Sequence, residues 1–204
     1  MTYGLQQFGT CDVEGFPSFR HTTIASPRLL LRAPRIEDFE QWRTLRKNNR
    51  DHLQPFEPTW SENWDAREAY QDSVLLQKTQ WRAGRSYGFL IFDRYEDTMI
   101  GGINIDNVVR GSAQFASLGY WICKTREGDG MMSEAMDVSL TFCRHALKLA
   151  RVNAATLAHN ARSQTLLERF SFEKEGVAKS YLAINGTRQD HILYGLSLSS
   201  EDLA

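Results

Sequence analysis

The segment best suited to hold a reactive ligand is Glu127-Gly128-Asp129-Gly130-Met131-Met132. Its two glycines, one residue apart, let the backbone approach a ligand closely, and a long stretch with helical periodicity follows directly. The free N–H groups of a first helical turn and the positive end of the helix dipole favour a bound phosphate or diphosphate. A simple tight turn would use the same glycines, so the segment alone leaves both interpretations open.

Nucleotide-binding motifs narrow the choice of ligand. The chain contains neither a G-x-x-x-x-G-K-S/T loop nor a G-x-G-x-x-G fingerprint, which argues against ATP and dinucleotides. A diphosphate ligand without either motif indicates coenzyme A.

Candidates for acid–base chemistry lie in two other segments. Glu57 follows Pro55 and precedes Pro58 on a stiff loop, which suits a base or an anchor for an amine, although a solvated loop acid has the same sequence. Asn160 and Ser163 have the types and spacing of a helix cap and a first-turn residue, and capping can coexist with a chemical role.

Histidine and cysteine signals are weaker. His52 and the pair Asp190-His191 could relay a proton through water, but a lone histidine is more often structural. Cys123 has no histidine at a spacing that would activate it, so we predict that it is not a nucleophile.

Composition excludes several protein classes. The 204 residues are 42% hydrophobic, enough for one substantial core, and the net charge of -1 does not favour direct nucleic-acid binding. The cysteines Cys11, Cys123 and Cys143 are odd in number and far apart, which fits a reducing compartment rather than a disulfide framework. We find no apolar run of membrane-spanning length and no signal-peptide pattern. We therefore expect a cytoplasmic protein without a membrane segment or a metal site.

The first half of the chain predicts an extension followed by helices. Residues 1–24 show no periodicity and are expected to form an N-terminal extension, leaving residues 25–204 as the domain. Residues 28–32 form a short strand pattern, and residues 38–49 have helical periodicity. Residues 54–58 contain two prolines and predict no regular structure. Thr59 to Glu62 has capping-box spacing, which predicts a second helix to about Trp81.

The second half predicts a sheet crossed by helices. Residues 87–92, 99–109 and 113–122 read as an antiparallel meander, in which Tyr120 and Trp121 are expected to be core or channel residues. Residues 128–150 have a wide apolar helical face, and a strand at 151–158 and a helix at 160–170 follow. Asn185-Gly186 predicts a hairpin between strands at 176–184 and 187–196.

Several motifs together resemble the GNAT acetyltransferase superfamily, and within it the RimJ/RimL branch, above all the RimJ-type ribosomal-protein alanine N-acetyltransferases. The resemblance covers roughly residues 28–196. The motifs are Leu118-Gly119-Tyr120-Trp121-Ile122, residues 127–135, His159-Asn160-Ala161-Arg162-Ser163, Phe172-Glu173-Lys174-Glu175-Gly176, residues 52–58 and Asn107-Val108-Val109-Arg110-Gly111-Ser112.

The resemblance implies an α/β (α+β) fold, with a mixed, twisted central sheet of about six to seven strands and helices on both faces. It implies that strands 113–122 and 151–158 splay apart to admit the pantetheine arm of acetyl-CoA. The binding residues that it implies are the backbone groups of Trp121 and Ile122 for pantetheine, the amides of Gly128, Asp129, Gly130, Met131 and Met132 for the diphosphate, Asn160 for pantetheine or a water, and Arg162 for a CoA phosphate.

Two residues depart from the family pattern. The family loop usually begins with Gln or Arg, whereas Glu127 stands here, and Asp129 occupies a position that is often basic or neutral. Two carboxylates beside a diphosphate are unfavourable unless they point to water or are neutralised, and Lys124 and Arg126 could offset them.

The expected function is acetyl transfer from acetyl-CoA to an amine, by direct attack in a ternary complex. The resemblance implies the N-terminal α-amine of an alanine in a ribosomal protein as the acceptor, with Ser163 protonating the CoA thiolate and Glu57 near the acceptor. Two alternatives stay open: acetylation of a small amine such as a polyamine, aminosugar or amino acid, and a CoA-binding or ribosome-associated module without turnover. The protein is expected to be a monomer or a homodimer.

Overall fold

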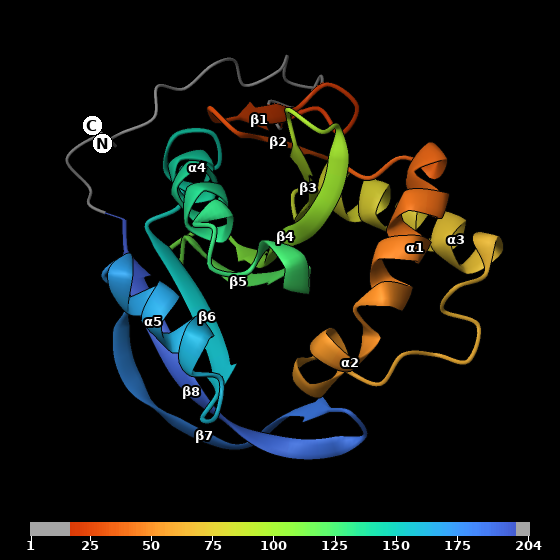
Figure 1. Cartoon of the computed structure of the whole chain (residues 1–204). Coiled ribbons are helices and arrows are strands. Elements are labelled where there is room, and N and C mark those ends of the chain that lie inside the picture. Colours follow the sequence, from red (N-terminus) through yellow and green to blue (C-terminus); the bar gives the residue numbers. More distant parts are fainter. Residues whose placement is uncertain (1–16, 199–204) are drawn as a thin grey trace.

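One sheet runs through residues 17–198, which are the residues that the computed structural model describes. Its strands are β1 (Thr23–Ala25), β2 (Leu29–Arg32), β3 (Tyr87–Asp93), β4 (Thr98–Val109), β5 (Phe115–Ile122), β6 (Arg151–Leu157), β7 (Glu173–Ile184) and β8 (Thr187–Ser197). The order is β1-β2-β3-β4-β5-β6-β8-β7 (Figure 1). Among the strands of the described residues, only β5 and β6 pair in parallel, so the sheet is mixed, as the resemblance implied.

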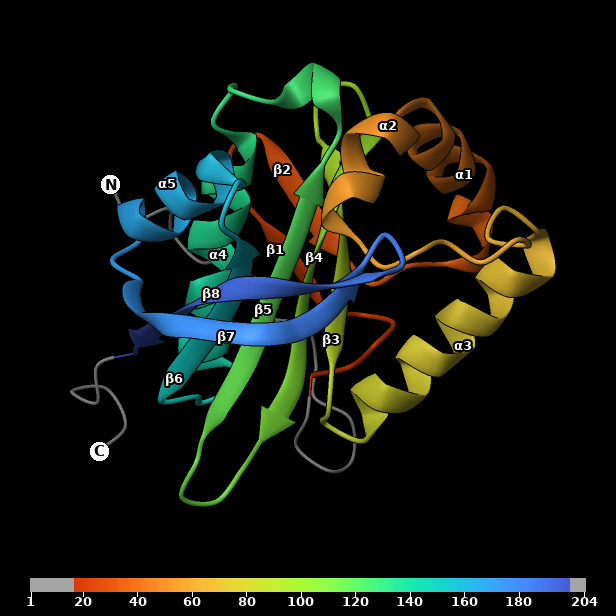
Figure 2. The ribbon, with the colours of Figure 1, turned by 90° about the horizontal axis from the view of Figure 1, so that it is seen from below.

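Helices cover both faces of this sheet. They are α1 (Phe39–Asn48), α2 (Arg50–Leu53), α3 (Arg67–Arg82), α4 (Met131–His145) and α5 (Ala161–Arg169), with the 3-10 turns η1 (Ile36–Asp38), η2 (Gln54–Phe56) and η3 (Lys124–Arg126). Figure 2 shows α1, α2 and α3 on one side of the sheet and α4 and α5 on the other. The wide apolar face predicted for the helix after Gly130 is buried, with Met136, Phe142 and Cys143 fully inaccessible.

The sheet has eight strands rather than six to seven, and the additional strand is β1. It lies across the end of the expected N-terminal extension and pairs with β2. Trp81 Nε1 also donates to the carbonyl oxygen of Pro17 at 2.6 Å, so the chain packs on the domain from that residue onward. Three residues are too few to show a period of two, which is why β1 could not be predicted from the sequence. Residues 1–16 of the extension, with Cys11, and residues 199–204 lie outside the described residues.

The predicted capping box at Thr59 to Glu62 is wrong, because α3 begins only at Arg67. The preceding residues pack as aromatic side chains instead: the rings of Trp60 and Trp64 lie 4.6 Å apart, and Trp64 also contacts Trp42 of α1. The prediction of no regular structure at residues 54–58 is also wrong, since η2 spans the first three of them. A proline at the start of a helical turn loses no hydrogen bond, so Pro55 is compatible with η2.

The hairpin prediction is confirmed. Asn185 and Gly186 have φ of 46° and 82°, and both residues of a type I′ turn require positive φ. Helix α4 ends at His145 rather than at residue 150 as expected, and Lys148 with φ of 53° turns the chain into β6. Within residues 17–198, no helix has the length and apolar character that crossing a membrane requires.

Candidate active site

Strands β5 and β6 are paired over only half of their length. The ladder joins Phe115 to Arg151 and ends where Leu118 meets Ala154. Beyond that point β5 continues to Ile122 beside β4, whereas β6 continues beside β8 as far as the pair Leu157 and His191. Figure 2 shows β7 and β8 running across the direction of β5. The two strands therefore diverge as the resemblance implied, and an opening forms between their carboxyl ends.

The backbone of Ile122 lines this opening. Cys123 N donates to Ile100 O of β4 at 2.8 Å. Because neighbouring residues of a strand direct their N–H and C=O groups to opposite sides, those of Ile122 point away from β4 and toward the opening. His52 Nε2 lies 3.2 Å from Ile122 O. One N–H and one C=O are thus placed where an amide-containing ligand arm could pair with them.

The glycine segment follows η3 and starts α4. Gly128 and Gly130 have φ of 86° and 76°, a region that side-chain-bearing residues rarely adopt. Gly130 is the N-cap of α4, and a glycine cap has no side chain to occupy the free N–H groups of the first turn. Those N–H groups, with the helix dipole behind them, suit a diphosphate at this corner of the opening.

An ion pair that the sequence analysis missed holds the start of α4. Glu134 accepts hydrogen bonds from Ser26 Oγ at 2.5 Å, from Arg28 N at 2.9 Å and from Arg28 Nε at 2.7 Å. Arg28 Nη1 also donates to Asp129 O at 3.1 Å, which ties the turn between β1 and β2 to the glycine segment. Burial alone would raise the pKa of Glu134, but these hydrogen bonds and the Arg28 charge hold it below the usual range. A carboxylate at the edge of the apolar stripe that contains Met131 and Val138 was the signal available.

The carboxylate of Glu127 is neutralised by its neighbours. It contacts Arg162 Nη1 of α5, and Lys124 Nζ lies 2.7 Å away and His52 Nε2 3.6 Å away. Burial raises its pKa, but the hydrogen bonds from Lys124 and Arg162 outweigh this and lower the pKa overall. Asp129 is half exposed, and its carboxylate lies 3.9 Å from the guanidinium of Arg126.

Ser163 and Asn160 lie at the β6 side of the opening. Asn160 caps α5, since its Oδ1 accepts from Ser163 N at 3.1 Å, so the capping role predicted for it is confirmed. Ser163 Oγ lies 2.8 Å from the hydroxyl of Tyr120 on β5. Burial raises the pKa of Tyr120 to about 12, so this hydroxyl stays protonated at neutral pH. Tyr120, expected as a core or channel residue, thus reaches across the opening to Ser163.

Glu57 lies on the segment of residues 54–60, which we call the proline loop. Its two carboxylate oxygens accept from Arg46 at 2.8 and 2.5 Å, and Oε2 also accepts from Trp60 Nε1 at 2.7 Å. Its carbonyl oxygen accepts from Asn185 N at the tip of the β7–β8 hairpin. The arrangement suits an anchor better than a proton acceptor, because Arg46 and Trp60 already use both oxygens.

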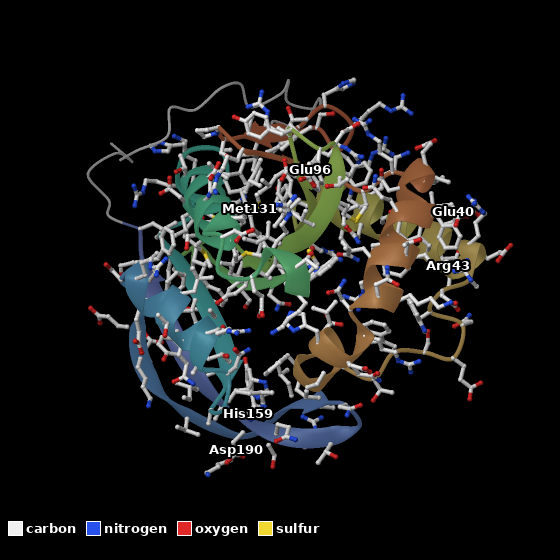
Figure 3. All side chains as sticks on the ribbon, in the orientation of Figure 1. Glu40, Arg43, Glu96, Met131, His159 and Asp190 are labelled. Atoms are coloured by element: carbon white, nitrogen blue, oxygen red, sulfur yellow. The ribbon has the colours of Figure 1, made fainter. Side chains whose placement is uncertain are left out.

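The remaining candidates are spread around the opening. His191 is buried on β8, with Nδ1 3.0 Å from Gln189 O, and Asp190 is paired with Lys179 Nζ at 2.6 Å. Figure 3 shows Asp190 and His159 near the β7–β8 hairpin, away from Met131 at the start of α4. Cys123 is buried, and among residues 17–198 no group of His, Cys, Asp and Glu could hold a metal ion.

Known proteins match this chain along most of its length. The family described as "Acetyltransferase (GNAT) domain" matches residues 28–173. The "[Ribosomal protein uS5]-alanine N-acetyltransferase" of Escherichia coli (strain K12) is 36% identical over 183 residues, 89% of this chain and 92% of that protein. Among solved structures, Mycobacterium smegmatis RimJ in complex with CoA-disulfide has a TM-score of 0.80 at 28% identity, covering 85% of this chain and 84% of that chain. The ribosomal-protein-S5-alanine acetyltransferase of Vibrio fischeri has a TM-score of 0.82 at 27% identity, covering 88% and 98%.

Proposed function

The chain belongs to the GNAT acetyltransferase family and is an acetyl-CoA-dependent N-acetyltransferase, and we propose that its acceptor is the N-terminal α-amine of an alanine in a ribosomal protein. The observation that carries the activity is the divergence of β5 and β6 beside the glycine segment. The choice of acceptor is supported by the similarity to the uS5-alanine N-acetyltransferase of Escherichia coli over nearly the whole of both chains. A ribosomal substrate would place the protein in the cytoplasm, as a monomer or a homodimer.

In the proposed mechanism, acetyl-CoA binds first and its pantetheine arm lies in the opening. The carbonyl oxygen of Ile122 accepts from an amide of that arm, with Asn160 at its other side. The backbone groups of Trp121, which were expected to share this role, face β4 by the same alternation. The amides of residues 128–132 hold the diphosphate. The groups of this chain fit the ligand: the C=O of Ile122, which also contacts His52 Nε2, can accept from a pantetheine amide, and the α4 N-terminus matches an anion. Arg162 would turn from Glu127 toward a CoA phosphate.

The reaction then proceeds by direct attack in a ternary complex. The neutral amine attacks the thioester carbonyl, and the N–H of Ile122 donates to the oxyanion. The C–S bond breaks, and the thiolate takes the proton of Ser163 Oγ. The new amide nitrogen releases a proton to water, and water returns a proton to the serine oxygen. An α-amine has a pKa of about 7.7–8.0, so a useful fraction is already neutral at physiological pH and no strong base is required. Glu57 accordingly serves as the anchor of the proline loop near the amine.

An acceptor screen tests the proposal. Wild-type protein is incubated with acetyl-CoA and either an alanine-start peptide, polyamines or aminoglycosides, and free thiol is measured. We expect thiol release with the peptide and a mass gain of one acetyl group at its N-terminus. Turnover of a small amine alone would favour the small-molecule alternative, and CoA binding without thiol release would favour a non-catalytic module. Mass spectrometry of N-termini from cells lacking the gene would then identify the ribosomal protein.

Replacing Glu127 by glutamine is expected to tighten coenzyme A binding about threefold, because an exposed ion pair contributes only up to about 1 kcal/mol. The carboxylate competes with the diphosphate for Arg162 and Lys124, and glutamine keeps the side chain's size without the charge. Calorimetry with coenzyme A at low and at high salt measures the change. A Glu96→Gln variant, whose carboxylate pairs with Arg126 on the exposed side of the same turn, provides the control. Weaker binding by Glu127→Gln would mean that Glu127 supports the loop rather than opposing the ligand.

A further inference from the structure

We propose that Arg46 is a positioning residue that fixes the acceptor end of the site, an inference that rests on the proposed function. The Arg46 side chain comes from α1 and its guanidinium donates to both carboxylate oxygens of Glu57 on the proline loop. The two side chains are only 13% and 19% exposed, so this ion pair is largely shielded from water. Its distinctive feature is that it connects separate segments around the opening.

The guanidinium of Arg46 lies over the rings of two tryptophans. Its central carbon lies 4.2 Å from the ring centre of Trp60 and 5.1 Å from that of Trp121 on β5. Trp60 in turn donates its Nε1–H to Glu57 at 2.7 Å. Arg46 therefore joins the strand expected to hold pantetheine to the loop expected to lie near the amine. The rigid, planar guanidinium of Arg46 sets the distance between β5 and the proline loop.

The connection continues to the third wall of the opening. Glu57 O accepts from Asn185 N at 2.9 Å, at the tip of the β7–β8 hairpin, and the ring of Phe56 lies 5.7 Å from that of His159 between β6 and α5. Figure 2 shows the hairpin reaching the loop that follows α2. A displaced proline loop would therefore release both the hairpin tip and the contact at His159.

A purely structural role for Arg46 would predict different effects of its replacement than a positioning role does. Breaking a buried ion pair destabilises a protein as a whole, whereas a positioning role affects the acceptor and leaves the cofactor segment unchanged. The start of α4 and the carbonyl of Asp129 are held by Arg28 and Glu134, and the contact from α2 to the glycine segment, between His52 and Glu127, does not involve Arg46. This separation makes the two ligands independent readouts.

The test is Arg46→Lys, which keeps the positive charge but removes the two-pronged donor and the planar stacking surface. We expect the KM for the acceptor to rise on the order of tenfold, since small misplacements of a bound reactant have large kinetic effects, and the KM for acetyl-CoA to stay within about twofold. Glu57→Gln, which preserves the shape of the loop, should change the same parameter in the same direction but less. Arg43→Lys is the matched control, because Arg43 lies one turn earlier on α1 (Figure 3). Its side chain is 40% exposed, and its ion pair with Asp65 is longer, at 3.5 Å.

Hydrogen–deuterium exchange provides a readout that does not depend on the acceptor. Arg46→Lys should speed exchange in the peptide containing Asn185 and leave the peptide of residues 128–135 unchanged. If wild-type protein acetylates no tested amine, the proposed function fails and this measurement alone decides the role of Arg46. Unchanged exchange at Asn185, or an equal loss of acceptor and acetyl-CoA affinity, would overturn the proposal.

Discussion

Replacing Ser163 by alanine is expected to lower the rate of acetyl transfer about 100-fold, the lower end of what a general acid contributes. The reason is that the departing thiolate would lose the proton donor proposed for it, while the attacking amine and the amides proposed to bind the diphosphate would be unaffected. The dissociation constant of coenzyme A should therefore stay within about twofold, because an alanine in the first turn of α5 removes no diphosphate ligand. Steady-state kinetics and calorimetry on the same preparation separate the two quantities.

A neighbouring hydroxyl, that of Tyr120, supports the proposed role of Ser163 as the acid. Tyr120 is protonated at neutral pH and its hydroxyl lies 2.8 Å from Ser163 Oγ, so it can donate to the serine and leave the serine proton free for sulfur. Tyr120→Phe should therefore slow transfer as well, by less than Ser163→Ala, since it removes only the second hydroxyl. Thr165→Ala, at an exposed position of the same helix, controls for changes in α5. Full activity in Ser163→Ala would eliminate the serine as the acid and point to water in its place.

Elements determined by neighbouring residues could be predicted from the sequence. Asn185-Gly186 specified the hairpin because only residues tolerant of positive φ fit a type I′ turn. Asn160 specified the start of α5 because its side chain accepts from the backbone N–H of Ser163, only three residues further along the chain. The apolar face of α4 likewise predicted its burial against the sheet.

Elements determined by contacts between residues far apart in the chain could not be predicted from the sequence. Glu134 and Arg28 are separated by 106 positions, and no local pattern shows that they meet. The same holds in part for Glu127: the sequence indicated Lys124 as a neutralising neighbour, and the two side chains do pair, but the partners His52 and Arg162 lie on other elements and were not indicated. Capping-box spacing at Thr59 was misleading because tryptophan packing at Trp60 and Trp64 outweighs a single cap.

The Glu134→Gln variant is expected to lower the free energy of unfolding by about 2–3 kcal/mol, because glutamine has no charge to pair with Arg28 and offers one acceptor oxygen in place of two to Ser26 and Arg28. The Glu134 side chain is 3% exposed, but Arg28 is 39% exposed, and water screening of the arginine keeps the loss below that of a fully buried pair. Urea denaturation at neutral pH measures it. Glu40→Gln is the matched control, because Glu40 forms a pair of similar length with Arg67 in which both side chains are about half exposed or more (Figure 3). The control should lose no more than about 0.5 kcal/mol.

The pH dependence of stability provides a second, independent test of the role of Glu134. The pKa of Glu134 is lower in the folded protein than the ordinary value of about 4.3, so its ionised form stabilises the fold above that value. As the pH falls below the ordinary value and then through the folded pKa, the wild-type protein loses this contribution, whereas Glu134→Gln has none to lose. The difference in stability between the two proteins should therefore be constant near neutrality and shrink in acid. Because Arg28 also donates to Asp129 O, the variant should weaken coenzyme A binding at neutral pH as well. A variant that lost stability but bound coenzyme A normally would show that the glycine segment holds its shape without the turn between β1 and β2.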